Sequence, residues 1–563
     1  MNKPRPGGPL PPHLANPDQL AQLTQKVAQQ FGAFGTRPDE EEMDRKVLQD
    51  NFLKPTLQII GGIFAASLFA YFASSPKFSG PGTWANSFRL DTALIIFWGP
   101  LLYWVMSKQR VWKALRIYLV LALFIETFAE AMFKDMGAVA SGEGGYWDSV
   151  LWPAAVAFFG TIKEFAGVPG ASLSVFTLLT IFLLYRAIRG PKPEGWTPPP
   201  KFARQALLTF FATVIGLAVV GILRGGGIEP AFRQTIHLMQ LPLVATLFLY
   251  GLRIPEDLAS VATAFVTVAA ARSLLVMYVY FGVCAPAGIT QLPGKPEWCT
   301  NHSDTVLFVT ALMILVAHNL EQRTRRVLVR SLLVGGPILL GIVLNNRRLA
   351  FISLFAAPLV IYLALRPSKR KRRVTWALAI AVPMLIGYVL VGSEIASTSP
   401  SPLLKPAQLV VSVMDQKDNS SISRDIENEN LIYTLHENPV ISQGFGHNYD
   451  YSPNNPPVDL GELFKNFRLI AHNGVLWIWS LGGVVGFTLL WMIYPLTSTL
   501  ALRGYRAAQS PLERSAALAS LGAVVVCVIQ IWGDQGFNSY MTLVTFGVAF
   551  AIATRLSVRA DAA

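Results

Sequence analysis

Long apolar segments separated by short polar stretches occupy most of this 563-residue chain. A helix that crosses a bilayer needs about 20 mostly apolar residues, and about fourteen segments meet that need. A further apolar segment, 150–161, is short and is followed at once by Lys163 and Glu164. The pattern predicts an all-α, polytopic integral membrane protein with about 14 transmembrane helices. The segments are 56–74, 91–107, 114–133, 171–188, 204–223, 237–251, 256–281, 304–320, 328–344, 349–366, 374–392, 473–495, 515–533 and 537–554.

Basic residues gather in five clusters between the apolar segments, and such clusters stay on the cytoplasmic side of a membrane. If 150–161 crossed the membrane, the first two clusters would lie on opposite sides. A re-entrant or interfacial segment places all five on one side, with both termini in the cytoplasm. The clusters are Lys108/Arg110/Lys113, Arg186/Arg189/Lys192, Arg323/Arg325/Arg326, Lys369/Arg370/Lys371/Arg372/Arg373 and Arg503/Arg506.

The same pattern divides the chain into four parts. Residues 1–50 are polar and rich in Pro, without the pattern of a cleavable signal peptide, and we expect a cytoplasmic tail. Residues 51–392 hold transmembrane helices 1–11 and the re-entrant segment near 150–161. Residues 393–472 form one large outward loop, and 473–563 hold helices 12–14. Long irregular loops are more often functional than spacers.

Composition agrees with a membrane protein, since 52% of residues are hydrophobic and 14% are charged. The formal net charge of +13 lies in clusters between apolar segments, which argues against nucleic-acid binding. The three cysteines contain no ligand-spaced pair, so a structural zinc site is not expected. In an oxidising compartment Cys284 and Cys299 could form a disulfide, or they could remain two thiols.

A polar stretch from Ser420 to Asn473 contains the candidate chemistry. Its first part predicts a helix on which Ile422, Ile426 and Tyr433 share one face, and Pro439 ends that helix at Asn438.

Arg424 lies in the first turn of this helix, where a cation gains nothing from the helix dipole. Its partner is either Glu427, in an ordinary surface pair, or a phosphate group, which Arg binds in bidentate fashion.

Two further candidates lie outside the predicted helix. His472 and Asn473 stand where the next apolar segment begins, and this His is either a capping residue or a general base. Arg347 and Arg348 occupy a very short outward hairpin, against the usual orientation of basic residues. They either reach lipid phosphates at the interface or bind a substrate.

Arg424, the Asn438-Pro439 stop, Gly444 and Gly446, and His472-Asn473 together resemble the bacterial O-antigen ligase and O-antigen (exopolysaccharide) polymerase superfamily. The resemblance extends from about Asn345 to Tyr494. It implies a GT-C-like fold with a mobile periplasmic loop over the outer helix ends, in the bacterial inner (cytoplasmic) membrane. It also implies metal-independent, inverting transfer of a glycan from undecaprenyl diphosphate to an acceptor hydroxyl.

The resemblance assigns roles to individual residues. His472 and Arg424 are the expected catalytic residues, and Arg347, Arg348 and Arg424 are expected to bind the diphosphate. Asn473, Asn438, Gly444 and Gly446 are expected to support them. The superfamily has one Arg at the outward hairpin, so either Arg347 or Arg348 is spare. His436 and His447 leave the identity of the base open.

Several alternatives remain open. Asp425 and Glu427 have a metal-like spacing, but an i,i+2 pair on a helix points to different sides. Glu126 and Glu130 could pair with Arg272 inside the membrane, and a lipid-linked sugar flippase or polysaccharide exporter would show such charges. The acceptor is a second glycan for a polymerase, which we favour, or lipid A core for a ligase. Other polysaccharide-assembly proteins are possible partners, besides membrane lipids.

Overall fold

The computed structural model describes residues 52–74, 100–125, 151–159, 173–192, 196–286, 300, 302–322, 324–345, 347–396, 404, 407, 419–455 and 468–562. The chain divides into two compact units, Met1–Pro55 and Thr56–Ala563, and the second contains nearly all of the described residues. The expected 1–50 tail, the Cys284–Cys299 pair and the two acidic residues Glu126 and Glu130 lie wholly or partly outside the described residues.

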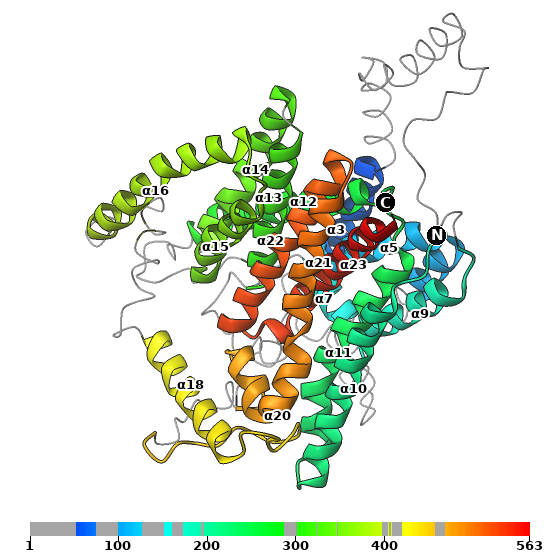
Figure 1. Ribbon diagram of the computed structural model, residues 1–563, viewed down its shortest axis with the longest axis vertical. Helices are drawn as coiled ribbons and strands as arrows, with labels where there is room; N and C mark the ends of the chain where they lie inside the picture. The colour runs from blue at the N-terminus through cyan, green and yellow to red at the C-terminus, as the bar shows by residue number, and fades with distance from the viewer. Residues whose placement is uncertain are drawn as a thin grey trace, which may run out of the picture. The chain divides into compact units, whose positions relative to one another are not determined.

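The described part of the chain is all-helical, as expected (Figure 1). The short segment at 150–161 forms α7, an eight-residue helix that is too short to cross a bilayer. The helices are α3 (Lys54–Ser74), α5 (Val111–Phe124), α7 (Trp152–Phe159), α9 (Val175–Arg189), α10 (Lys201–Leu223), α11 (Ile228–Gly251), α12 (Leu258–Tyr278), η6 (Val279–Cys284), α13 (Asp304–Glu321), α14 (Arg325–Asn345), α15 (Arg348–Ala364), α16 (Lys369–Ala396), α18 (Asn419–Glu437), α20 (Gly474–Trp491), α21 (Ile493–Ala507), α22 (Pro511–Gly533), η9 (Gly536–Asn538) and α23 (Tyr540–Ala562).

Within the described ranges, the structure contains 8 helical segments that are long and apolar enough to cross a membrane. The protein is therefore a multi-pass membrane protein, and the expected total of about 14 spans stays a prediction. One segment, Gly474–Ala507, joins α20 and α21 and is 34 residues long. Gly483 interrupts it with a φ of 63°, a conformation that glycine adopts without strain, and so divides α20 into 474–482 and 484–491.

The packing centre of the second unit is formed by α22 and α23. The helix α22 packs against α13, α15 and α21, and α23 packs against α11, α21 and α22. In the most apolar 18-residue stretch of α23, 94% of the residues are buried inside the protein, whereas none are buried in the corresponding stretch of α16. Local sequence supports the start of α22, because Ser510 and Glu513 form a capping box and Pro511 occupies the first turn.

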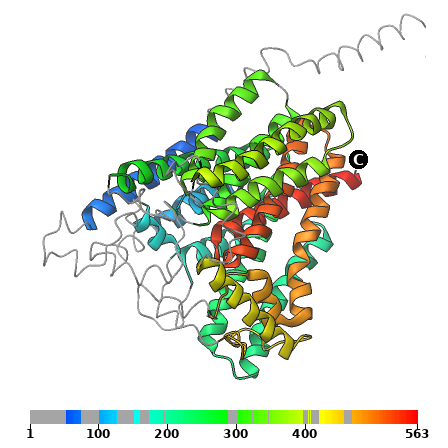
Figure 2. The same ribbon diagram turned by 90° about the vertical axis from the view of Figure 1, so that its left-hand side faces the viewer.

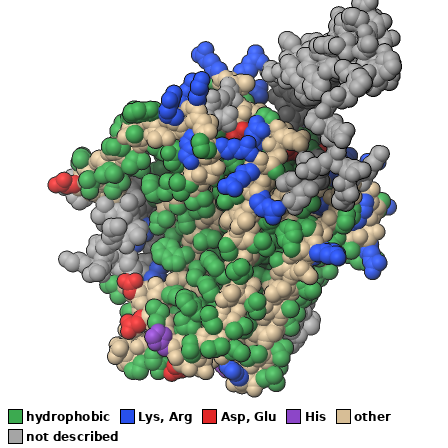
Figure 3. Space-filling model, viewed as in Figure 1, with side chains coloured by type: hydrophobic (Ala, Val, Ile, Leu, Met, Phe, Trp, Pro, Cys, Tyr) green, Lys and Arg blue, Asp and Glu red, His purple; other side chains and the backbone are tan. Residues whose placement is uncertain are grey.

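The basic clusters gather at one end of the helices, which we call the basic end. Arg186 donates hydrogen bonds to the carbonyls of Met106 and Gln109, which brings the first two clusters together. Arg366 bonds the carbonyl of Arg506, beside the last two. Figure 3 shows Lys and Arg concentrated there on the visible face. These bonds join the first two clusters and the last two, and the prediction that all five share one side of the membrane stays a prediction.

The opposite end, which we call the site end, holds the C-terminal ends of α10, α14 and α22 and the N-terminal ends of α13 and α20. Helices of 18 to 23 residues separate the two ends, and these span about 27 to 35 Å at 1.5 Å per residue. In the side view, α18, α20 and the segment after α18 lie together there (Figure 2).

Candidate functional site

The helix α18 presents a polar face to the rest of the protein. Glu427, Asn430, Leu431 and Thr434 are buried, at the i, i+3, i+4, i+7 spacing of one helical face. The face that Ile422, Ile426 and Tyr433 were expected to share is not the buried one, since Ile422 is exposed. Buried polar groups need partners, and Asn430 and Thr434 find them in the backbone N–H groups of Ser452 and Asp450, at 2.9 and 2.8 Å.

Glu427 binds His472. Its carboxylate accepts a hydrogen bond from the His472 backbone N–H at 3.1 Å, and its oxygens lie 3.2 and 3.3 Å from Nδ1 of the imidazole. The Glu427 residue is 6% exposed. A carboxylate at Nδ1 selects the tautomer with the proton on that nitrogen, so Nε2 is the nitrogen that can accept one. This arrangement is the one a general base requires.

The neighbouring residues hold His472 in place from both sides. Asn473 caps α20, since its Oδ1 accepts from the Leu476 N–H at 3.1 Å, and its Nδ2 donates to Asn428 on α18 at 3.0 Å. On the other side the backbone N–H of Gln535 donates to the His472 carbonyl at 2.8 Å. The Gln535 side chain donates to the carbonyl of Ile470 at 2.9 Å. Gln535 has a φ of 50°, uncommon for a residue other than glycine.

A second group of charged side chains lies beside this pair. His302 Nδ1 is 3.0 Å from Asp534 Oδ2. Burial raises the pKa of the Asp534 carboxyl, but the charge and hydrogen bond of His302 and the charges of Arg347 and Arg424 outweigh burial and hold this pKa below its usual range. Burial and the charge of Arg347 lower the pKa of His302. The group therefore brings together one carboxyl group, one imidazole and two guanidinium groups.

Arg424 connects the two groups. It is on α18 three residues before Glu427, and side chains at that spacing have Cβ atoms about 5 to 6 Å apart. The alternative that Arg424 forms a surface pair with Glu427 is wrong, because Glu427 binds His472 instead. The Asp534-Gln535 turn also lies between the two groups. Asp534 interacts with the charges of Arg347 and Arg424, and the backbone N–H of Gln535 donates to His472.

The end of α14, just before Arg347, belongs to a buried network. Asn345 accepts a hydrogen bond from the Thr300 backbone N–H at 3.1 Å, and the Thr300 hydroxyl bonds Asp304. Asp304 forms a fully buried ion pair with Arg272, with N–O distances of 2.6 and 2.9 Å. Arg272 has Asp304 as a partner in the described part of the chain, and the expected Glu126 and Glu130 lie outside that part.

The glycine loop 444–446 contacts the end of α10 directly. Gly444 and Gly446 have φ angles of 84° and 106°, which favour glycine. Phe445 donates its backbone N–H to Leu217 at 3.0 Å and stacks on Trp477 with a centroid distance of 5.7 Å.

Hydrogen bonds join the described part of the expected loop to α11 at the site end. Gln234 on α11 donates to the carbonyls of His447 and Leu469 at 3.0 and 2.7 Å, and accepts from the Gly446 N–H at 2.5 Å.

The remaining candidates lie elsewhere. Arg348 begins α15, and the main charges that act on Asp534 and His302 include that of Arg347. Asn438 is exposed just after α18. His436 is exposed at the end of α18, and His447 Nε2 lies 3.1 Å from the Gly221 carbonyl oxygen. Asp425 is exposed while Glu427 is buried, so these two carboxylates point to different sides, as their spacing predicted.

Sequence reasoning missed Glu427 as the partner of His472, and it did not single out Gln234. For His302, Asp534 and Gln535 it favoured solvation at the interface over binding of sugar or lipid phosphate. One signal was available: Glu427, Asn430 and Thr434 repeat at helical spacing in a segment whose apolar stripe is interrupted. For the other four no signal was available, because these contacts join residues 65 to more than 200 positions apart.

Comparison with known proteins finds one similarity. Residues 331–491 match the family model described as Wzy_C, O-antigen ligase. That range extends from α14 to the end of α20 and includes Arg347, Arg424, Glu427 and His472. No curated protein matches the chain. Residues 331–491 of this multi-pass membrane protein are thus similar to the O-antigen ligase family of that model.

Proposed function

We propose that the protein is a membrane glycosyltransferase that moves a glycan from undecaprenyl diphosphate to an acceptor hydroxyl, and that it polymerises polysaccharide repeat units. The observation that supports this most is the contact of Glu427 with His472 Nδ1, with Arg424 one helical turn away on α18. A general base with a cation nearby suits a reaction in which a hydroxyl attacks a sugar whose leaving group is anionic.

His472 is the proposed general base. The acceptor hydroxyl loses its proton to Nε2 while its oxygen bonds to the anomeric carbon of the donor sugar. Glu427 holds the ring through Nδ1 and stabilises the positive charge that the imidazole gains. A positioned general base contributes about 10² to 10⁴ in rate.

Arg347 and Arg424 are the proposed diphosphate ligands. When the bond between the anomeric carbon and the diphosphate oxygen breaks, its electron pair remains on the diphosphate, and fixed guanidinium groups stabilise the added charge. Both act on Asp534, so two cations lie close to the candidate base. The incoming phosphates bring negative charge that these cations stabilise, and the proposed reaction uses no metal. Attack opposite the leaving group inverts the anomeric carbon.

The proposed location is the bacterial inner membrane, with the basic end and both termini in the cytoplasm and the site end in the periplasm. Five basic clusters at one end support this orientation, because such clusters stay in the cytoplasm. The acceptor is a second lipid-linked glycan, and other polysaccharide-assembly proteins are proposed as partners.

A second candidate is ligation of the finished glycan to lipid A core. The description of the matching family, O-antigen ligase, favours it. Ligation uses the same donor, so Arg347, Arg424 and His472 would have the same roles, and only the acceptor would differ.

The experiment that tests the proposal compares cells carrying His472→Ala with a full deletion and with His436→Ala. His436 is an exposed histidine on the same helix as Arg424, so its replacement is a matched control. We expect His472→Ala to remove the product while the protein remains in the membrane, and His436→Ala to leave the product unchanged. The measurement is surface polysaccharide chain length together with the glycan on lipid A core.

The pattern of loss separates the candidates. Loss of long chains, with single units still reaching the core, supports polymerisation. Long chains that accumulate on the lipid carrier, with bare core, support ligation instead. Normal glycan in His472→Ala but not in the deletion contradicts both, and indicates a flippase, an exporter or a non-catalytic scaffold.

A further inference from the structure

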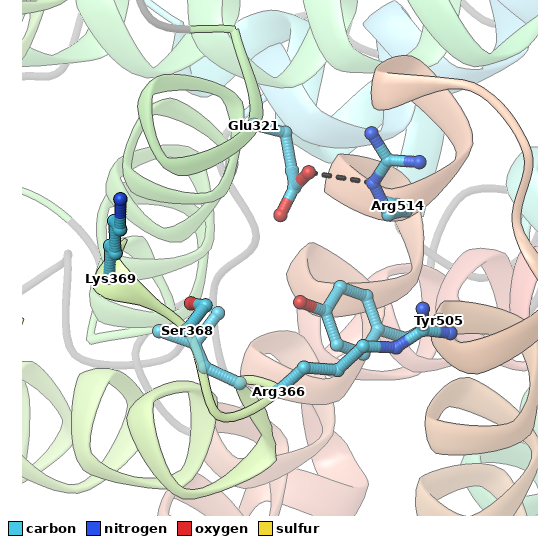
Figure 4. Close-up of a pocket in the computed structure, with 7 residues that line it drawn as sticks. Glu321, Arg366, Ser368, Lys369, Tyr505 and Arg514 are labelled. Carbon is cyan, nitrogen blue, oxygen red and sulfur yellow. Dashed lines mark hydrogen bonds and ion pairs between the residues drawn. The ribbon is translucent and has the colours of Figure 1, made fainter. Parts of the chain in front are cut away.

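A cavity of about 400 Å³ lies at the basic end, far from the proposed active site. It is bounded by the end of α13, the connection between α15 and α16, the end of α21 and the start of α22. Its size falls in the range of sites that hold small ligands or head groups. The lining residues are Glu321, Leu365, Arg366, Ser368, Lys369, Tyr505 and Arg514 (Figure 4).

The charge of this cavity is positive. Glu321 and Arg514 face each other across one side, and their N–O distance of 2.7 Å makes them a neutral pair. Arg366 bonds the carbonyl of Arg506 and lies 5.9 Å from the centre of the Tyr505 ring. Among the described residues, neither Arg366 nor Lys369 has a carboxylate partner. Two cations therefore remain to be neutralised by something that enters the cavity.

The surrounding backbone strengthens the site for an anion. Lys369 is the first residue of α16, and the positive end of a helix dipole attracts phosphate. Lys371 donates to the carbonyls of Leu363 and Leu365 at 3.3 and 3.1 Å, which brings a third cation close to the same connection. The hydroxyl groups of Ser368 and Tyr505 can donate to phosphate oxygens.

The outer surfaces next to the cavity are apolar. On α15, Phe355, Leu359 and Leu363 are exposed at four-residue intervals, and on α16 Trp376 and Ile380 are exposed. A hydrogen bond of 2.9 Å between Tyr362 and Thr375 holds the start of α16 against the end of α15. A ligand with a phosphate in the cavity would therefore have apolar helix surface beside it, which suits acyl chains and not a soluble ion.

We propose that the cavity lined by Arg366, Lys369 and Ser368 binds the phosphate of an anionic phospholipid whose acyl chains lie along α15 and α16. The chemistry it shares with a free phosphate ester is charge and hydrogen bonding, and the lipid adds contact with the apolar surface. Basic pockets between membrane helices bind anionic head groups in this way. The site does not depend on glycan transfer.

The test uses the full-length protein in a neutral detergent and measures lipid binding by native mass spectrometry. Phosphatidylglycerol is titrated against phosphatidylcholine, and glycerol 3-phosphate is added as a soluble competitor. We expect wild-type protein to prefer phosphatidylglycerol, and Arg366→Gln with Lys369→Gln to weaken its binding about tenfold through the loss of two cations. Arg372→Gln with Arg373→Gln removes the same charge from exposed positions outside the cavity, and should leave binding within about twofold.

The single variant Lys369→Gln is the control for a folding defect, because Lys369 is exposed and has no side-chain partner among the described residues. We expect this single change to weaken phosphatidylglycerol binding about threefold without a change in melting temperature. Equal binding of the two lipids, or equal losses in both double variants, would contradict the proposal. Competition by glycerol 3-phosphate at the concentrations at which lipid binds would also overturn it, since the site would then accept free phosphate.

Discussion

The Glu427 carboxylate favours His472 as a general base rather than as a capping residue. Histidines at helix starts are commonly capping residues, but here Asn473 provides the cap and leaves His472 for another role. Glu427 Oε1 and Oε2 both lie within 3.3 Å of Nδ1. Neither His436 nor His447 is bonded to a carboxylate among the described residues, so the geometry favours His472 as the base.

Replacement of Glu427 by Gln tests this positioning role. The neutral amide keeps the size of the side chain but removes the charge that stabilises the protonated ring, so we expect transfer to fall about 10- to 100-fold. Glu429→Gln, an exposed change on the same helix, is the control. Equal activity of the two variants would show that Glu427 does not act through His472.

The two arginines of the outward hairpin should differ in effect. Arg347 is among the main charges that act on both His302 and Asp534, whereas Arg348 is the first residue of α15. We expect Arg347→Gln to reduce transfer at least tenfold, because one cation at the leaving group is lost, and Arg348→Gln to change it by less than about threefold. Transfer assays with a lipid-linked donor measure this. The reverse ranking would move the assignment to Arg348.

At the scale of elements, glycines allow α10, α20 and the 444–446 loop to approach closely. A Cβ on Gly221 would overlap the carbonyl oxygen of Phe445, and a Cβ on Gly483 would overlap that of Val440. The N–H of Val484 donates to Pro439 at 2.8 Å, so the interruption of α20 and the turn after α18 stabilise each other. The expected supporting role of Gly444 and Gly446 stays a prediction, and these contacts favour it.

Gly221→Ala should displace the glycine loop. The added methyl group cannot fit against Phe445 without backbone movement, and such overpacking costs about 1 to 3 kcal/mol. Transfer should fall and the melting temperature should drop. Gly216→Ala on the same helix is the matched control, because a Cβ there has nothing within 4 Å. It should leave activity unchanged and stabilise the helix by up to about 1 kcal/mol. Equal effects of the two changes would mean that the contact does not hold the loop.

At the scale of the molecule, the basic clusters and the candidate site residues lie at different ends of the helices. This separation is the basis of the expected orientation. Ion pairs and hydrogen bonds bring the basic clusters together at one end. The candidate base and the candidate diphosphate ligands gather at the other end. The direction of the chain in the membrane follows from the distribution of basic residues and stays a prediction.

Cysteine labelling in intact cells tests the orientation. Asn454 is exposed at the site end and Ser368 is exposed at the basic end, whereas Ser452 is buried and unsuitable. We expect Asn454→Cys to react with a membrane-impermeant thiol reagent from outside the inner membrane and Ser368→Cys to react only after permeabilisation. The unsubstituted protein measures the background from its own three cysteines. The opposite labelling would reverse the proposed topology.

Hydrophobic periodicity alone indicated the all-helical membrane class, most of the described helices and the short α7, because apolar length and basic flanks are local properties of the chain. It did not indicate α21 or the first turns of α11, which contain more polar residues. The local motifs around Arg424 and His472 also indicated the family. Only the tertiary structure decided that Glu427 binds His472 and that Arg347 and Arg424 act on Asp534 beside His302. These contacts join residues 45 to more than 200 positions apart. No local pattern specifies such pairs, since packing of whole helices brings them together.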